Sequence, residues 1–312
     1  MTSLTTSPGI TIANAPISYG AFEVTVGIDP NVPDGLAILD EVAAAGYAGI
    51  DLGPVGYLGG GEELGRRLSK RGLGLAGAYL EFPFADAEGL QAVLPELDSM
   101  LDTFDAALRH IGGPPPRPTI ADNGAEHRRA APGSGSRNPA SGHDQAGWDA
   151  FGTGLSIVVE RCRDRGYEPT FHHETGTYVE SPAEIEKVLS LSDVGLCLDT
   201  GHLLVGGGNP IDMLRKWSGR INHIHIKDAD LAKFGQLVAD AEPTTSIWSR
   251  EVFPILGAGD LNADAFIDTL LEVEYRGWLV VEQDILPRTS ERFQQAIADQ
   301  RRNRAFLAAH GL

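Results

Sequence analysis

The sequence has little of several features that would each indicate a particular class of protein. Only two of its 312 residues are cysteine, Cys162 and Cys197. Two cysteines in a chain of this length cannot build a disulfide framework, so we expect both to be buried thiols. No apolar run approaches the roughly 18 residues that a membrane span needs, although 42% of the residues are hydrophobic. We therefore expect a soluble protein with a sizeable core and no membrane partner.

Basic residues are also scarce. Lys and Arg together number 25 against 43 Asp and Glu, which gives a formal net charge of −18. Binding to a phosphate backbone depends on Lys and Arg that release counterions, so we expect no nucleic-acid partner. An acidic surface favours cations and neutral polyols instead, although the same charge can equally serve solubility alone.

Two sequence features of targeting and cofactor binding are missing as well. The first nine residues contain neither the basic segment nor the apolar core of a secretory signal peptide. We therefore expect a cytoplasmic protein with a frayed N-terminus. No Gly-x-Gly-x-x-Gly turn follows any apolar run, which argues against a dinucleotide-binding fold.

The chain does contain a regular alternation of short apolar runs and helical patterns. The apolar runs predict eight strands, over residues 9–16, 47–52, 73–80, 118–121, 168–173, 194–198, 221–226 and 278–281. Helices are predicted over residues 35–45, 62–71, 90–108, 148–165, 210–217, 263–271 and 291–309, and after an N-cap at Ser181. Strand followed by helix is the repeat of an α/β protein, and eight repeats predict a (β/α)8 TIM barrel that spans residues 1–312 as a single domain.

Two segments interrupt this alternation. Residues 122–145 are rich in Asn, Gly, Ala, Arg, Pro and Ser, and such a composition buries too little apolar surface to offset the entropy of ordering it. We predict a mobile loop there, which is either a lid carrying one histidine and three arginines or an insertion without a role. Residues 229–260, with a lone Trp248, predict a second insertion beside the site.

Four successive predicted strands end near a residue that can hold a metal ion or move a proton: Glu174, Asp199, His225 and Glu282. The first two gaps are 25 and 26 residues, close to the roughly 30 residues of one βα unit. Because barrel enzymes carry their chemistry where the strands end, we predict one site at this rim. Three carboxylates and one imidazole form a hard ligand set without a thiolate, which suits Mn²⁺, Mg²⁺ or Co²⁺ better than a structural Zn²⁺. We expect one divalent ion, with Mn²⁺ first and Zn²⁺ as an alternative.

Two histidines beside these ligands are predicted to bind the substrate. His202 lies three residues after Asp199, so both side chains can point at one small molecule. The alternative for His202 is a histidine bonded to the backbone at a helix N-terminus. His173, which precedes Glu174, is included in the predicted substrate site.

The predicted strand at residues 221–226 offers further polar residues. Lys227 shares the parity of His225 and reaches the rim, where its ammonium can hold a substrate oxygen. His223 has the same parity one layer deeper, and we interpret it as a structural residue. Asp228 points the other way and is expected to orient a neighbouring loop.

Four segments resemble the sugar phosphate isomerase/epimerase superfamily with the xylose isomerase-like barrel, and most closely its inosose dehydratase branch. They are residues 176–180, 197–202, 223–228 and 277–284. The resemblance is strong over residues 171–284 and weaker over residues 10–52. It implies the metal ligands Glu174, Asp199, His225 and Glu282. Two positions depart from the pattern, since the dehydratase branch tends to carry a histidine at Glu174 and epimerases place an arginine near Leu231.

The resemblance and the ligand set both imply removal of a proton from a carbon next to a carbonyl, through an enediolate. Glu174 and Glu282 would flank the substrate, one taking the proton and the other giving one back. We expect a metal-dependent isomerase or epimerase of a sugar or polyol. The alternatives are an inosose dehydratase and the catalytic subunit of a C-glycoside-cleaving complex that acts on 3-keto-glycosides; a sugar-binding protein without activity is least expected. The expected partner is a small sugar or cyclitol, and a homo-oligomer or a second subunit are further alternatives.

Overall fold

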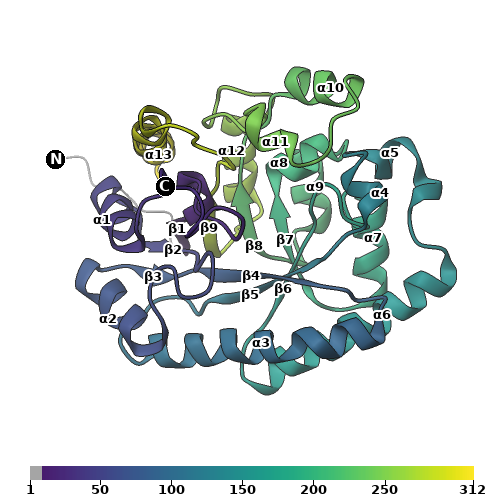
Figure 1. Ribbon diagram of the computed structural model, residues 1–312, viewed down its shortest axis with the longest axis horizontal. Coiled ribbons are helices and arrows are strands. Elements are labelled where there is room, and N and C mark those ends of the chain that lie inside the picture. Colours follow the sequence, from purple (N-terminus) through teal and green to yellow (C-terminus); the bar gives the residue numbers. More distant parts are fainter. Residues whose placement is uncertain (1–8) are drawn as a thin grey trace.

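The computed structural model describes residues 9–312, in which the strands form one parallel sheet wound into a barrel (Figure 1). The strands are β1 (Ile10–Asn14), β2 (Gly49–Ile50), β3 (Gly74–Leu75), β4 (Gly77–Phe82), β5 (Arg117–Asp122), β6 (Thr170–His172), β7 (Gly195–Asp199), β8 (Ile221–Ile226) and β9 (Gly277–Val281). Their order is β3-β2-β1-β9-β8-β7-β6-β5-β4. The TIM barrel that the sequence predicts is confirmed. The frayed terminus predicted for the first residues falls outside the described part of the chain, apart from Gly9.

The barrel closes through β3 and β4, which are two halves of one strand interrupted at Ala76. On one side Ala76 N–H donates to Ile50 O of β2 at 2.9 Å, and on the other Arg117 N–H donates to Ala76 O at 2.9 Å. Nine strands therefore occupy the eight positions predicted from the sequence. A Cβ at Gly77 would lie 2.7 Å from Arg117 O, so this close approach requires glycine.

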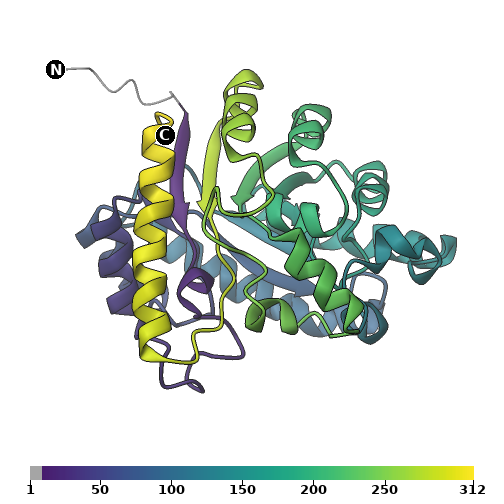
Figure 2. The same ribbon diagram turned by 90° about the horizontal axis from the view of Figure 1, so that it is seen from above.

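Helices surround the barrel, as the two views show (Figures 1 and 2). They are α1 (Gly35–Ala45), α2 (Gly61–Arg71), α3 (Ala87–Leu108), α4 (Glu126–Arg129), α5 (Ser134–Arg137), α6 (Gln145–Asp164), α7 (Pro182–Leu191), α8 (Thr200–Val205), α9 (Pro210–Trp217), α10 (Leu231–Ala239), α11 (Ser246–Ser249), α12 (Ala263–Glu272) and α13 (Ser290–Ala309). The predicted cap of α7 is present as a capping box between Ser181 and Glu184. Among residues 9–312, no helix has both the length and the apolar character needed to cross a membrane.

Side-chain alternation separates the apolar layer under the helices from the side chains of the barrel interior. On β6, Phe171 packs outward, with its ring centroid 6.0 Å from that of Phe84 and 6.1 Å from that of Phe151 on α6. His172, the next residue, points the opposite way, toward the site. Burial of each such aromatic ring stabilises the fold by roughly 1.5–3 kcal/mol. The main core therefore lies between the strands and the helices. The barrel interior holds the polar side chains of the site and a small apolar cluster that includes Trp278 and Val280.

The segment of residues 122–145 is more ordered than its composition indicated. It contains α4 and α5, and Arg128 of α4 is fully buried. Arg128 Nη2 lies 2.8 Å from Glu184 Oε1 and 3.2 Å from Glu180 Oε1, and Arg128 Nε donates to Thr177 O. Buried ion pairs and hydrogen bonds, rather than apolar burial, hold this segment against α7. Its mobility in the absence of substrate stays a prediction.

The second insertion also has its own structure. Residues 229–260 contain α10 and α11, and an apolar cluster forms between them from Phe234, Leu237, Ile247, Val252 and Phe253. Asp228, just before this segment, accepts hydrogen bonds at 2.9 Å from the backbone N–H groups of Gly257, Gly259 and Leu261. The expectation that Asp228 orients a neighbouring loop is confirmed. Cys162 and Cys197 are free and buried, as predicted.

Candidate active site

Three of the four predicted ligands meet inside the barrel. Asp199 ends β7, His225 lies on β8 beside it in register, and Glu282 follows β9. His225 Nδ1 lies 3.1 Å from Glu282 Oε2 and 3.8 Å from Asp199 Oδ2. The ligand atoms of the three residues all lie within 4.8 Å of one another, and all three side chains are buried. Adjacent parallel strands therefore bring these residues together as the sequence indicated.

Glu174 is not part of this group of three. The hydroxyl of Tyr79 on β4 donates a short hydrogen bond to Glu174 Oε2, and it also lies 3.1 Å from Glu81 Oε1. Burial raises the pKa of Glu174 to about 8, and the nearby charge of Glu81 contributes to the increase. The carboxyl group of Glu174 is therefore largely protonated at neutral pH.

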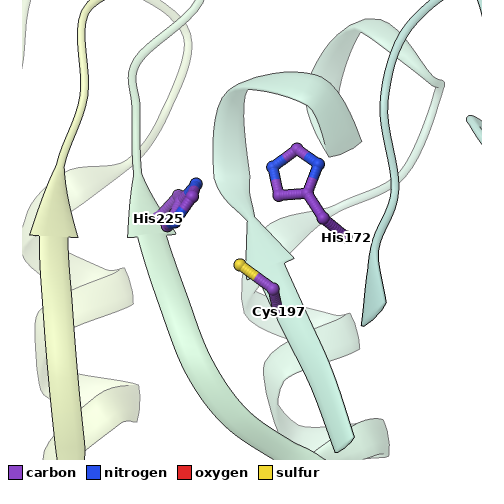
Figure 3. Close-up of side chains that lie close together, drawn as sticks. All are labelled: His172, Cys197 and His225. Carbon is purple, nitrogen blue, oxygen red and sulfur yellow. The ribbon is translucent and has the colours of Figure 1, made fainter. Parts of the chain in front are cut away.

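His172 takes part in the site although the sequence reasoning missed it. Its Nε2 lies 3.6 Å from Asp199 Oδ2, and its ring centroid lies 5.1 Å from that of His225. Figure 3 shows the two imidazoles and the Cys197 thiol turned toward a common space from β6, β7 and β8. The apolar Phe171 before it could have revealed that His172 faces inward, since neighbouring strand residues alternate.

The two predicted substrate histidines are both buried among site residues. His173 Nε2 accepts the backbone N–H of Asp199 at 3.2 Å, and burial lowers the pKa of His173 to about 3. The backbone N–H of His202 donates to Asp199 Oδ1 at 2.9 Å, so Asp199 also caps α8. The His202 ring points elsewhere, with Nε2 at 3.3 Å from Lys227 Nζ. The structure thus places His202 beside Lys227, and His173 against the backbone of β7.

Lys227 is buried between three carboxylates. Its Nζ lies 3.1 Å from Asp199 Oδ2, 3.0 Å from Glu282 Oε2 and 2.8 Å from Asp284 Oδ1. Burial alone would lower the pKa of Lys227, but the three negative charges, led by Asp199, raise it well above the ordinary value. Lys227 therefore remains an ammonium. Asp284 lies in a segment that the sequence had singled out, but its contact with Lys227 was not predicted.

The same contacts hold two of the carboxylates ionised. Burial would raise the pKa of Asp199, but Lys227 and then His202 lower it, and the net pKa lies well below the ordinary range. Burial acts in the same way on Glu282, while His225 and Lys227 lower its pKa more strongly. Both groups are therefore carboxylates at neutral pH, the form that binds a cation.

A deeper layer lies below these residues. Asp51, just after β2, has its Oδ2 at 3.5 Å from His225 Nε2. The His223 ring centroid lies 5.2 Å from that of His225, and both Asp51 and His223 are buried. His223 therefore occupies the deeper inward position that its parity predicted.

The donor set fits a divalent metal ion. Asp199 Oδ2 and both ring nitrogens of His225 are buried without a well-aligned hydrogen bond, as is His172 Nδ1. A buried polar atom without a partner costs about 1–3 kcal/mol, and an ion between the carboxylates and imidazoles would satisfy several of them. Carboxylate oxygens and imidazole nitrogens together suit Mn²⁺, Co²⁺ or Zn²⁺.

Comparison with curated proteins finds relatives over most of the chain. The rhizopine catabolism protein MocC of Rhizobium meliloti is 31% identical over 255 residues, which cover 79% of this chain and 73% of that protein. The inosose dehydratase of Geobacillus kaustophilus is 26% identical over 269 residues, 83% of each protein. The inosose dehydratase of Bacillus cereus (strain AH820) is 32% identical over 158 residues, but these span only 48% of this chain and 51% of that protein.

Solved structures share the fold. A structure of the IOLI protein with a bound zinc atom has a TM-score of 0.69 at 15% identity and covers 97% of this chain and 99% of its own. A structure of L-ribulose 3-epimerase has a TM-score of 0.66 at 17% identity, with 96% of this chain and 94% of its own covered. Residues 39–306 match the family described as xylose isomerase-like TIM barrel. The chain belongs to the xylose isomerase-like TIM barrel family, as the resemblance in its sequence indicated.

Proposed function

We propose that this protein is a divalent-metal-dependent enzyme that removes a proton from the carbon next to a carbonyl of a sugar or cyclitol. The observation that carries the proposal is the convergence of Asp199, His225 and Glu282 beside a buried ammonium. A bound divalent ion would supply Lewis-acid stabilisation of the negative charge that develops on substrate oxygens.

For the fourth ligand we propose His172 in place of Glu174. His172 Nε2 lies 3.6 Å from Asp199 Oδ2, whereas Glu174 is engaged by Tyr79. Burial and His225 lower the pKa of His172, so its imidazole is neutral and can bind a metal. Mn²⁺ remains the ion we expect, and the zinc atom in the IOLI structure supports Zn²⁺ as the alternative.

Glu282 and Glu174 are proposed to divide the proton transfers. Glu282 is ionised and can therefore accept a proton, although its lowered pKa makes it a weaker base than an ordinary glutamate, while Glu174, whose pKa is raised to about 8, suits an acid. Carboxyl groups whose pKa values differ in this way take opposite roles in acid–base catalysis. Lys227 and His202 are proposed to bind a substrate oxygen, since they lie 3.3 Å apart beside Asp199.

Dehydration is the reaction that these roles and the relatives favour. Loss of the proton beside the carbonyl gives an enediolate, and a protonated Glu174 can then transfer its proton to a β-hydroxyl, which leaves as water while a carbon–carbon double bond forms. The relatives aligned over 83% and 48% of this chain are inosose dehydratases, which makes a keto-cyclitol the first substrate to test. Return of the proton to a carbon of the substrate would instead give epimerisation or isomerisation, which were the reactions expected first from the sequence.

Product analysis of a substrate panel tests the proposal. The protein with Mn²⁺ is incubated with inososes, ketoses and 3-keto-glycosides, and a chelator should abolish turnover. An ultraviolet-absorbing enone from an inosose would support dehydration, whereas new stereoisomers would support epimerisation. Cleavage of a 3-keto-C-glycoside that needs a co-purified second chain would favour the third alternative. Turnover unaffected by the chelator would contradict a metal-dependent reaction.

A further inference from the structure

Asp51 has a buried carboxyl group that faces His225, a proposed metal ligand, across the barrel interior. In the sheet, β2 and β8 are separated by β1 and β9. The contact of 3.5 Å between Asp51 Oδ2 and His225 Nε2 therefore crosses the barrel interior. The backbone of Asp51 is fixed by a hydrogen bond of its N–H to Asn14 O at 2.9 Å.

Both ring nitrogens of the His225 imidazole face carboxyl groups. Its Nδ1 faces Glu282 Oε2 at 3.1 Å and Asp199 Oδ2 at 3.8 Å, and its Nε2 faces Asp51. A neutral imidazole that binds a metal through Nδ1 carries its proton on Nε2, and this N–H needs an acceptor. The structure places the carboxyl group of Asp51 at that position, with Oδ2 at 3.5 Å from Nε2.

We infer that Asp51 is a positioning residue that fixes the tautomer and the orientation of His225 for metal binding. The inference rests on the metal site proposed above. Among the described residues, Asp51 Oδ1 has no hydrogen-bond partner, while Asp51 Oδ2 faces His225. A buried carboxylate is costly when it lacks compensating contacts. The space for it depends partly on Gly77, since a Cβ there would lie 3.3 Å from Asp51 Oδ1.

A second, deeper ion is the competing interpretation. Ligand atoms of Asp51, His223 and His225 also lie within 4.8 Å of one another. With an ion in each group, His225 would bind one through Nδ1 and the other through Nε2, which requires an imidazole without either ring proton. A single ion leaves the proton on Nε2, where Asp51 can accept it. The two interpretations differ in the number of ions per chain.

Metal affinity and stoichiometry of purified variants test the inference. We expect Asp51→Ala to bind Mn²⁺ and Zn²⁺ about 10–100-fold more weakly than wild type in competition with a chromophoric chelator, the usual effect of losing such a partner. Asp51→Asn keeps an oxygen that can accept the N–H and should recover part of the affinity. Both variants should still bind one ion per chain at saturation.

Two control variants separate this effect from general damage. Cys162→Ala removes the other buried thiol, which lies on α6 outside the site, and should change the affinity less than about twofold. Asp122→Ala removes a buried carboxylate at the end of β5, where Asp122 Oδ1 accepts the N–H groups of Gly124 and Tyr178. It should reduce stability without weakening metal binding.

The tautomer provides a readout that a purely structural role would not change. In Zn²⁺-loaded wild type with ¹⁵N-labelled histidine, we expect a protected Nε2–H on His225, and in Asp51→Ala this proton should exchange faster with solvent. Wild-type affinity in Asp51→Ala, or two ions per chain, would overturn the inference and leave the proposed function intact. A wild-type protein that binds no divalent ion would overturn the metal site itself, and with it the role of Asp51.

Discussion

At the scale of single residues, the site is a balance of buried charges in which Lys227 compensates three carboxylates. Removing one member of such a group leaves uncompensated charge in the interior, which typically costs about 3–5 kcal/mol. A divalent ion would neutralise two of the same carboxylates, Asp199 and Glu282. Lys227 and the proposed ion would therefore both neutralise the negative charge of Asp199 and Glu282.

Replacement of Lys227 by methionine should destabilise the metal-free protein by about 3–5 kcal/mol, and Mn²⁺ should restore part of the loss. Urea denaturation with a chelator and with Mn²⁺ measures both values. Lys216→Met is the matched control, because Lys216 forms an exposed ion pair with Glu186 and its loss should cost at most about 1 kcal/mol. An equal loss for Lys227→Met with and without Mn²⁺ would contradict the shared role.

Asp122 should give the protein a stability that depends on pH. Burial raises the pKa of Asp122 from 3.8 to about 6. Between these values the folded state binds more protons than the unfolded state, so this group's contribution to stability falls as the pH rises from about 4 to 6 and is constant above. Asp122→Asn cannot ionise and should be more stable than wild type at pH 7.5, by about 3 kcal/mol at most. Parallel urea curves at pH 4.5 and 7.5 check this, and a gain of the same size at both values would be evidence against it.

At the scale of elements, we expect the stability of the segment at residues 122–145 to depend on Arg128. Arg128→Met would leave Glu180 and Glu184 without their guanidinium partner, and we expect a loss of about 3–5 kcal/mol in stability. Protease should then cut this segment faster than in wild type, since local opening becomes easier. Arg129→Met, next to it on α4 and exposed, is the control. The mobility predicted for wild type would appear as cleavage of the same segment without substrate, and its resistance would refute that prediction.

The elements also show how far sequence reasoning reaches. The strands at residues 194–198 and 221–226 were predictable because continuous apolar runs indicate buried parallel strands. Asp199 and His225 were then predicted as site residues because they lie near the ends of these strands. The inward direction of His172 was harder to predict, because β6, Thr170–His172, has only three residues and the apolar Phe171 is the one neighbour that indicates it. The contacts of Arg128 with Glu180 and Glu184 join residues more than 50 positions apart, and composition carries no information about such pairs. Asp51 faces His225 only once the barrel has closed.

At the scale of the whole molecule, the closed barrel brings ionisable side chains from distant parts of the chain together in its interior. Asp51 and Glu282 lie near opposite ends of the sequence, and both approach His225. The fold and the family are shared with proteins named as dehydratases and epimerases. The reaction that we propose for this chain therefore depends on its own side chains, in particular on the proposed roles of Glu282 as a base and Glu174 as an acid.

Solvent exchange at the carbon next to the carbonyl is the most direct test of this account. Wild-type protein with Mn²⁺ is incubated with the inosose and ketose panel in heavy water, and deuterium in recovered substrate and product is measured by mass spectrometry. We expect deuterium at that carbon in recovered substrate or in an epimerised product, or at the former β-carbon of a dehydration product once its enol becomes a ketone. We also expect the turnover rate to fall by about 10²–10⁴-fold in Glu282→Gln. Turnover of the same compound by Glu282→Gln and Glu174→Gln at the wild-type rate would contradict the account, because no base or acid would remain.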